Sequence, residues 1–180
     1  MVADVPQRDR RKQAAVKYAL VVAVFIILAV AYYYSFRRFA RSSDDANILL
    51  AGQEMSNGNW RLKGWWLPED NFLTTHVLLY AILVKCIGFT PYAMFYLPAI
   101  LWAGVASLSV VLAQGGRTGK ERAVAVAAVT TPILLPIIRN NGAMDQIAHD
   151  WAHAGTILYV LFSVLAAHAA PVSTLVVTPA

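Results

Sequence analysis

Two short polar stretches hold most of the residues in this sequence that are able to do chemistry. In the first, RRFARSSDDANILLAGQEMSNGNW, three arginines precede two adjacent carboxylates: Arg37, Arg38, Arg41, Asp44 and Asp45. A carboxylate held beside an acceptor hydroxyl can take its proton while a new bond forms. Arginine binds phosphate through paired hydrogen bonds and tolerates a partly dry site better than lysine does. These residue types therefore suit group transfer from a phosphate-bearing donor.

The same aspartates also have a structural explanation. Ser42 or Ser43 can cap a helix whose first turn then holds both carboxylates, where the helix dipole favours negative charge. Apolar residues follow near one face at helical spacing, and Gly58 ends the segment: Ile48, Leu49 and Met55. The pattern predicts a short amphipathic helix lying along a membrane surface. It leaves open whether the aspartates are catalytic or structural.

The second polar stretch is MDQIAHDWAH, in which Asp145, His149 and His153 recur at every fourth position. On a helix they would share one face, and two histidines one turn apart can ligate a metal. His149 and His153 with Asp150 come within one methylene of the H-E-x-x-H of zinc proteases, but the catalytic glutamate is replaced. Two other interpretations stay open. The histidines are interfacial residues at the end of a span, or they line the same cavity as Asp44 and bind phosphate or a divalent cation.

The elements that must position these residues are apolar. The chain has 180 residues, of which 58% are hydrophobic and 14% charged, against roughly 25% charged residues in an ordinary soluble domain. Apolar blocks cover about 18–36, 72–89, 92–113, 121–138 and 154–170, and the first matches the roughly 20 residues that cross a bilayer. We expect an all-α fold: a polytopic transmembrane helical bundle of about five apolar helices, with a juxtamembrane amphipathic helix in the first outer loop.

The first apolar block resembles a signal peptide in having a basic segment, RDRRKQAAVK, before it. The block is too long, however, and it ends in YYYSFRR with no small-residue cleavage site. The tyrosines are typical of an interfacial aromatic belt. We therefore interpret the block as an uncleaved anchor. Binding of nucleic acid is disfavoured, because no folded basic domain remains outside the spans.

The distribution of basic residues predicts sidedness. Residues 1–17 form a basic tail that the positive-inside rule places in the cytoplasm. A single transmembrane domain, 18–170, follows, with a first outer loop at 37–71, a second at 139–153 and a short tail at 171–180. The inner membrane of a bacterium is the expected location.

One segment conflicts with this arrangement. If the second and third blocks both cross the membrane, Arg117, Lys120 and Arg122 lie outside, against the positive-inside rule. The second block is short and carries His76 and Lys85, so we favour a partly inserted or juxtamembrane helix there. The basic turn is then inside, and residues 139–153 face the same compartment as the aspartates.

The stretch DDANILLAGQEMSNGNWRLKGWWLPEDNF after a first span resembles the N-terminal part of GT-C fold glycosyltransferases. That family includes protein O-mannosyltransferases and lipid A aminoarabinose transferases, which use polyprenyl-phosphate sugars. Its first outer loop carries an acidic pair, a juxtamembrane helix and often a G-[ND]-W turn, here Gly58, Asn59 and Trp60. HAGTILYVL, beginning at His153, is also similar to a stretch in such relatives, whereas FLTTHVLLY lacks the His-Pro-Pro of the mannosyltransferase branch.

The resemblance implies a sugar transferase that acts on the outer face with a polyprenyl-phosphate-linked donor. Asp44 or Asp45 would be the general base, and the three arginines 37, 38 and 41 would bind the donor phosphate. Further residues would shape the site: Trp60, Asp70, His149 and His153. A divalent cation is the one candidate cofactor, and membrane lipids are the other expected partners.

Two other classes of protein are alternatives to a glycosyltransferase. A non-catalytic helical membrane subunit, or a truncated remnant, would bind anionic lipid or a larger partner through the outer arginines and tryptophans. A transporter or channel component would need polar residues within its spans, and Lys85 is nearly alone there.

Overall fold

The computed structural model describes residues 7–38, 43–66, 73–139 and 151–169, and every regular element in these ranges is helical. The elements are α1 (Gln7–Phe36), α2 (Ser43–Ser56), a π-helical turn η1 (Leu73–Val77), α3 (Leu78–Ile87), α4 (Ala93–Gln114), α5 (Gly119–Arg139) and α7 (Trp151–Ala169). The predicted all-α fold is confirmed. Each of the five apolar blocks lies largely within a helix.

Two of these helices are long and apolar enough to cross a membrane. They are Tyr18–Phe36, with a mean hydropathy of 2.3, and Ala93–Gln114, with 1.9. Within the described ranges, the apolar helices at Leu73–Ile87 and Ala154–Ala166 are shorter. Two candidate spans are therefore identified by length and composition, whereas the polytopic bundle of about five apolar helices stays a prediction.

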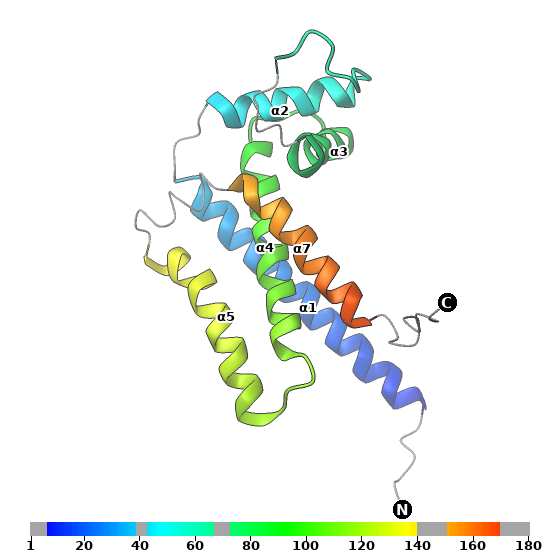
Figure 1. Cartoon of the computed structure of the whole chain (residues 1–180), viewed down its shortest axis with the longest axis vertical. Coiled ribbons are helices and arrows are strands. Elements are labelled where there is room, and N and C mark those ends of the chain that lie inside the picture. The colour runs from blue at the N-terminus through cyan, green and yellow to red at the C-terminus, as the bar shows by residue number, and fades with distance from the viewer. Residues whose placement is uncertain (1–6, 39–42, 67–72, 140–150, 170–180) are drawn as a thin grey trace, which may run out of the picture.

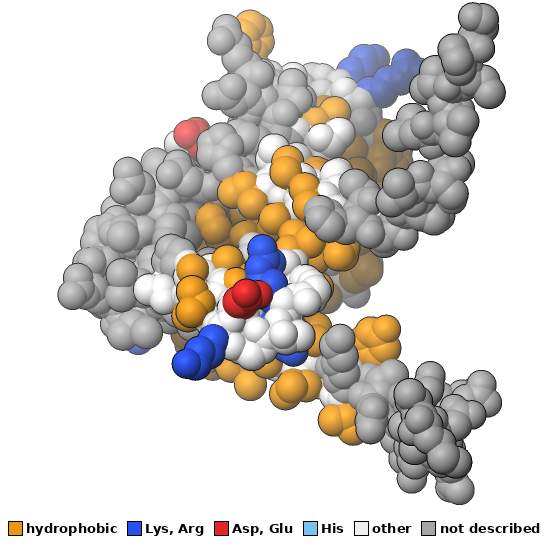
Figure 2. All heavy atoms as spheres, turned by 60° about the horizontal axis from the view of Figure 1, so that its bottom comes forward, with side chains coloured by type: hydrophobic (Ala, Val, Ile, Leu, Met, Phe, Trp, Pro, Cys, Tyr) orange, Lys and Arg blue, Asp and Glu red, His pale blue; other side chains and the backbone are white. Residues whose placement is uncertain are grey.

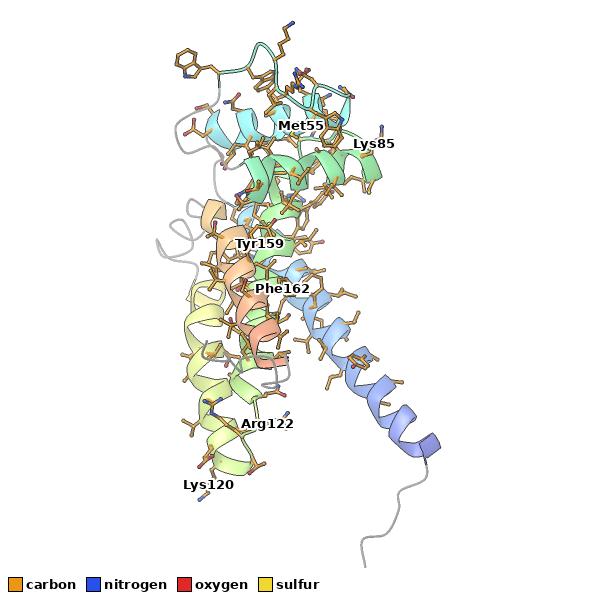
Figure 3. The ribbon with its side chains drawn as sticks, turned by 45° about the vertical axis from the view of Figure 1, so that its right-hand side comes forward. Met55, Lys85, Lys120, Arg122, Tyr159 and Phe162 are labelled. Carbon is orange, nitrogen blue, oxygen red and sulfur yellow. The ribbon has the colours of Figure 1, made fainter. Side chains whose placement is uncertain are left out.

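The long helices run from one end of the molecule toward the other, with α1 at an angle to the rest, and two shorter helices lie across one end of them (Figures 1 and 3). The long helices are α1, α4, α5 and α7, with α4 in contact with each of the other three. Figure 3 shows the same division: Met55 and Lys85 mark the crosswise pair, α2 and α3, while Lys120 and Arg122 mark the opposite end. We call these the α2 end and the basic end.

Small residues on α4 allow its neighbours to approach closely. Tyr32 and Phe36 of α1 are fully buried against Ala99 and Ala103 of α4. On the other side, a Cβ added to Gly104 would lie 3.3 Å from Leu158 of α7. Small residues at such interfaces are the usual means by which apolar helices pack in lipid.

The amphipathic helix predicted after the first span is present as α2, but its apolar face is covered by protein. Leu49, Ala51 and Met55 are buried, and α2 packs mainly on α3. The contact is tight, because a Cβ on Gly52 would approach the Tyr80 Cβ to 2.5 Å. The buried face of α2 therefore packs on α3, and the position of α2 along a membrane surface stays a prediction.

Because α3 lies across the bundle, the start of α1 and the basic turn between α4 and α5 lie at the same end of the molecule. α1 begins at the basic end, and the turn from α4 into α5 lies at the same end (Figures 1 and 3). That turn carries Arg117, Lys120 and Arg122. This placement agrees with a second apolar block that does not cross the membrane, but whether the block crosses stays a prediction. Which compartment each end faces stays a prediction.

Candidate functional site at the α2 end

The structure brings together the segments that the sequence singled out. α1 ends, α2 begins and α7 begins at the α2 end (Figure 1). Arg37 and Arg38 follow the last turn of α1, and His153 lies in the first turn of α7. Arg41, Asp70 and His149, all predicted site residues, lie outside the described residues. The side chain of His153 is also outside them.

The two aspartates have different surroundings although they are adjacent. Both lie in the first turn of α2, where the helix dipole favours negative charge. Asp44 is exposed, whereas Asp45 is only 6% exposed. Successive helical residues point about 100° apart, and Asp45 shares the buried face with Leu49, four residues on. Asp44 is therefore accessible to a substrate, and Asp45 is held against the protein.

Arg37 is held by aromatic rings. Its guanidinium carbon lies 5.6 Å from the ring centre of Tyr33 and 5.4 Å from that of Tyr92. Its Nη1 also donates a long hydrogen bond of 3.5 Å to the Tyr33 hydroxyl. Tyr33 stacks on Tyr96 of α4 with ring centres 5.1 Å apart. Arg37 thus links α1 to the start of α4, and Arg38, also exposed, follows it directly.

The sequence reasoning missed this aromatic site. Tyr33 is four residues before Arg37, a spacing that places the two side chains together on a helix. The contact between these two residues could therefore be predicted from the sequence. Tyr92 comes from a distant segment, and only the packing of α1 on α4 brings it to the arginine.

The turn after α2 is organised by Asn59 rather than by Trp60. The Asn59 Oδ1 accepts a 2.9 Å hydrogen bond from the Lys63 backbone N–H, and its Nδ2 donates to Glu54 and to the Lys63 carbonyl at 3.3 Å each. The Leu62 side chain in the same turn is buried, and its backbone has a positive φ of 48°. Trp60 itself is 61% exposed. It is available to a ligand or a lipid surface but does not support the turn.

His76 is a fully buried residue of the π-helical turn. Its Nδ1 lies 2.9 Å from the Thr75 hydroxyl, and a Cβ on Gly155 of α7 would come within 3.4 Å of its Cε1. The Tyr159 hydroxyl of α7 also donates a 3.2 Å hydrogen bond to the Thr74 carbonyl. His76 thus packs between η1 and α7.

Within the described parts of the chain, no three His, Cys, Asp or Glu residues form a group able to hold a metal ion. The expected cation ligands His149 and His153 have no described side chains, so the divalent cation stays a prediction. A groove of about 500 Å³ is present, but it is lined by the basic half of the long helices and contains neither aspartate.

Scans against protein families, curated proteins and solved structures find no match for this chain. Proposals about its function therefore depend on the residues themselves and on how the fold arranges them.

Proposed function

We propose that this chain is a membrane glycosyltransferase, or the N-terminal part of one, that transfers a sugar from a polyprenyl-phosphate donor to an acceptor at the α2 end. The observation that carries the proposal is that one exposed and one buried aspartate, Asp44 and Asp45, lie at the same end of the molecule as two exposed arginines that follow a span-length helix.

A membrane setting is supported by the surface of α1. Only 11% of its most apolar window is buried, and Tyr18, Leu20 and Ile27 are each more than 60% exposed. Soluble monomers rarely expose contiguous apolar surface on this scale. Lipid surrounding α1 would cover these side chains, and the α2 end would then lie at a membrane–water boundary. The tyrosines beside Arg37 suit that depth.

The roles follow from exposure. Asp44 accepts the proton of the acceptor hydroxyl as that oxygen bonds to the anomeric carbon of the sugar. The bond from that carbon to the phosphate oxygen breaks, and the polyprenyl phosphate leaves with the electron pair. Arg38 and Arg41 neutralise the phosphate charge. Asp45 fixes the first turn of α2, and Arg37 completes the phosphate site while it anchors α1 to α4.

The test uses the full chain in membranes with radiolabelled polyprenyl-phosphate mannose and polyprenyl-phosphate aminoarabinose as donors. Transfer of label to membrane acceptors should be abolished when Asp44 and Asp45 are both replaced by Asn. Glu121→Gln is the matched control, since this exposed carboxylate lies at the basic end and should leave transfer unchanged. Full transfer by the double variant, with normal membrane insertion, would overturn the proposal.

A second candidate function is a non-catalytic membrane subunit that binds anionic lipid at the α2 end. Trp66 is 92% exposed and Trp60 61%, and exposed Arg61 and Lys63 lie between them. Aromatic and cationic side chains mixed in this way suit the headgroup region. This function predicts that Arg37→Glu with Arg38→Glu weakens binding to phosphatidylglycerol vesicles, whereas Asp44→Asn has no effect.

A further inference from the structure

We infer that the groove between α1, α4 and α5 is a binding site for one anionic phospholipid, with its acyl chain in the groove and its phosphate at the basic end. This site is separate from the acid pair and does not depend on the glycosyltransferase proposal. The groove has a volume of about 500 Å³, within the range of about 300–1,000 Å³ that is usual for small-molecule sites.

The walls of the groove are apolar over most of its length. α1 contributes four aliphatic residues and α4 contributes three more: Leu20, Val21, Val24, Leu28, Ala106, Val110 and Val111. Leu28 follows Leu20 by eight residues, which is about 12 Å along the helix. Leu20, Val21 and Val24 are 64%, 40% and 43% exposed, so the groove is open at the side where lipid would surround α1. A hydrocarbon chain therefore has both a matching wall and a way in.

The end of the groove is polar and cationic. Arg122 and Gln114 both line it, and the Arg122 Nη2 donates a 2.6 Å hydrogen bond to the Gln114 Oε1. The Arg117 Nη1 donates to the Ala113 carbonyl at 3.1 Å, which keeps a second guanidinium at the same turn. Arg122 therefore stands directly where a headgroup would emerge from the apolar walls.

Positive charge dominates this end. Arg117, Lys120 and Arg122 are exposed, and Glu121 is the one carboxylate among them in the turn. Figure 2 looks toward the basic end and shows Lys and Arg side chains around a carboxylate, next to apolar side chains. Basic pockets between membrane helices are typical sites for anionic lipid headgroups. A zwitterionic lipid would gain the apolar contact but little of the electrostatic attraction.

The groove also contains the hydroxyl of Ser107, which lacks a hydrogen-bond partner among the described residues. The Ser107 Oγ is buried, and Ser107 lines the groove. It lies seven residues before Gln114 on α4, which is about 10 Å along the helix. A lipid ester carbonyl placed between headgroup and chain could accept its hydrogen bond, which would satisfy a polar atom that otherwise costs stability.

The experiment measures lipid binding to the purified full chain by native mass spectrometry from detergent micelles. Phosphatidylglycerol should bind as a single tight adduct, and phosphatidylcholine with the same acyl chains should bind at least tenfold more weakly. Arg122→Gln should weaken phosphatidylglycerol binding about fivefold, the effect of one cation near an anionic headgroup. Lys85→Gln, which removes an exposed cation at the α2 end, should leave it unchanged.

A second pair of variants tests the groove itself. Val24→Trp fills it, and Val22→Trp is the matched control, because Val22 is 55% exposed and does not line the groove. The first should abolish the adduct and the second should not, with both keeping wild-type helix content. Equal binding of the two lipids, an adduct that survives Val24→Trp, or equal losses from Lys85→Gln and Arg122→Gln would each overturn the proposal.

Discussion

The backbone of Gly52 in α2 lies directly against the side chain of Tyr80 in α3. A Cβ added to the glycine would stand 2.5 Å from the Cβ of the tyrosine. The added carbon would also lie 3.1 Å from the Ala81 nitrogen and the Val77 carbonyl oxygen. The crosswise layer that carries Asp44 and Asp45 is therefore held at a distance that only glycine permits.

Replacement of Gly52 by Ala should destabilise the protein by about 1–3 kcal/mol, the usual cost of overpacking. Thermal unfolding followed by circular dichroism gives the measurement. Gly116→Ala is the control, since no atom lies within 4 Å of the Cβ it would add. Equal melting temperatures for the two variants would show that α2 does not pack on α3 in this way.

The contacts of Arg37 with two tyrosine rings should contribute measurably to the free energy of unfolding. Each cation–π contact at an exposed site contributes about 0.5–1 kcal/mol, and Arg37 makes two. Arg37→Gln should therefore lower the free energy of unfolding by about 1–2 kcal/mol. Arg38→Gln serves as the control, because no ring contact of Arg38 was found in the described structure and its side chain is exposed. A larger loss from the Arg38 variant would contradict the geometry.

The two ends of the bundle should label from opposite sides of the membrane. Cys86 is the one cysteine of the chain and is exposed at the end of α3. It should react with a membrane-impermeant maleimide from the same side as Asn57→Cys in a Cys86→Ser background. Lys120→Cys in that background should react only when the opposite side is opened to reagent. Labelling of all three from one side of intact cells would rule out the proposed crossing of α4.

Asn59 should protect the turn that follows α2 from proteolysis. Its three hydrogen bonds to Glu54 and Lys63 close this turn, so Asn59→Ala should loosen it. Cleavage by trypsin after the exposed residues Arg61 and Lys63 should then be several times faster, as judged by the rate at which intact chain disappears. Asn57→Ala changes an exposed asparagine of the same turn and should leave the rate unchanged.

Local patterns predicted the helices well. α2 begins at Ser43 with the two aspartates in its first turn and ends just before Gly58, whose φ is positive, because helix-end preferences are properties of single positions. The long uncharged run from Tyr18 to Phe36 likewise predicted a span-length helix. What covers each helix face could not be read in the same way, since that depends on distant segments.

The candidate site shows this limit most clearly. The sequence treats Asp44 and Asp45 alike, and only the packing of α2 leaves one exposed and buries the other. The sequence predicted Trp60 as a site residue, whereas Asn59 makes the side-chain hydrogen bonds that close the turn. Hydrogen bonds of this kind depend on side-chain geometry, for which the sequence has no periodic signal.

The contact between α1 and α4 is confined to one end of α1. Tyr32 and Phe36 are buried on α4, whereas Val16 and residues 18–24 are exposed, and α1 leans away from the other helices toward its start (Figure 3). A helix fixed at one end can change its tilt without breaking its packing. In bilayers of different thickness, α1 would therefore absorb the hydrophobic mismatch, and the position of Arg37 relative to Tyr92 would stay constant from one membrane to another.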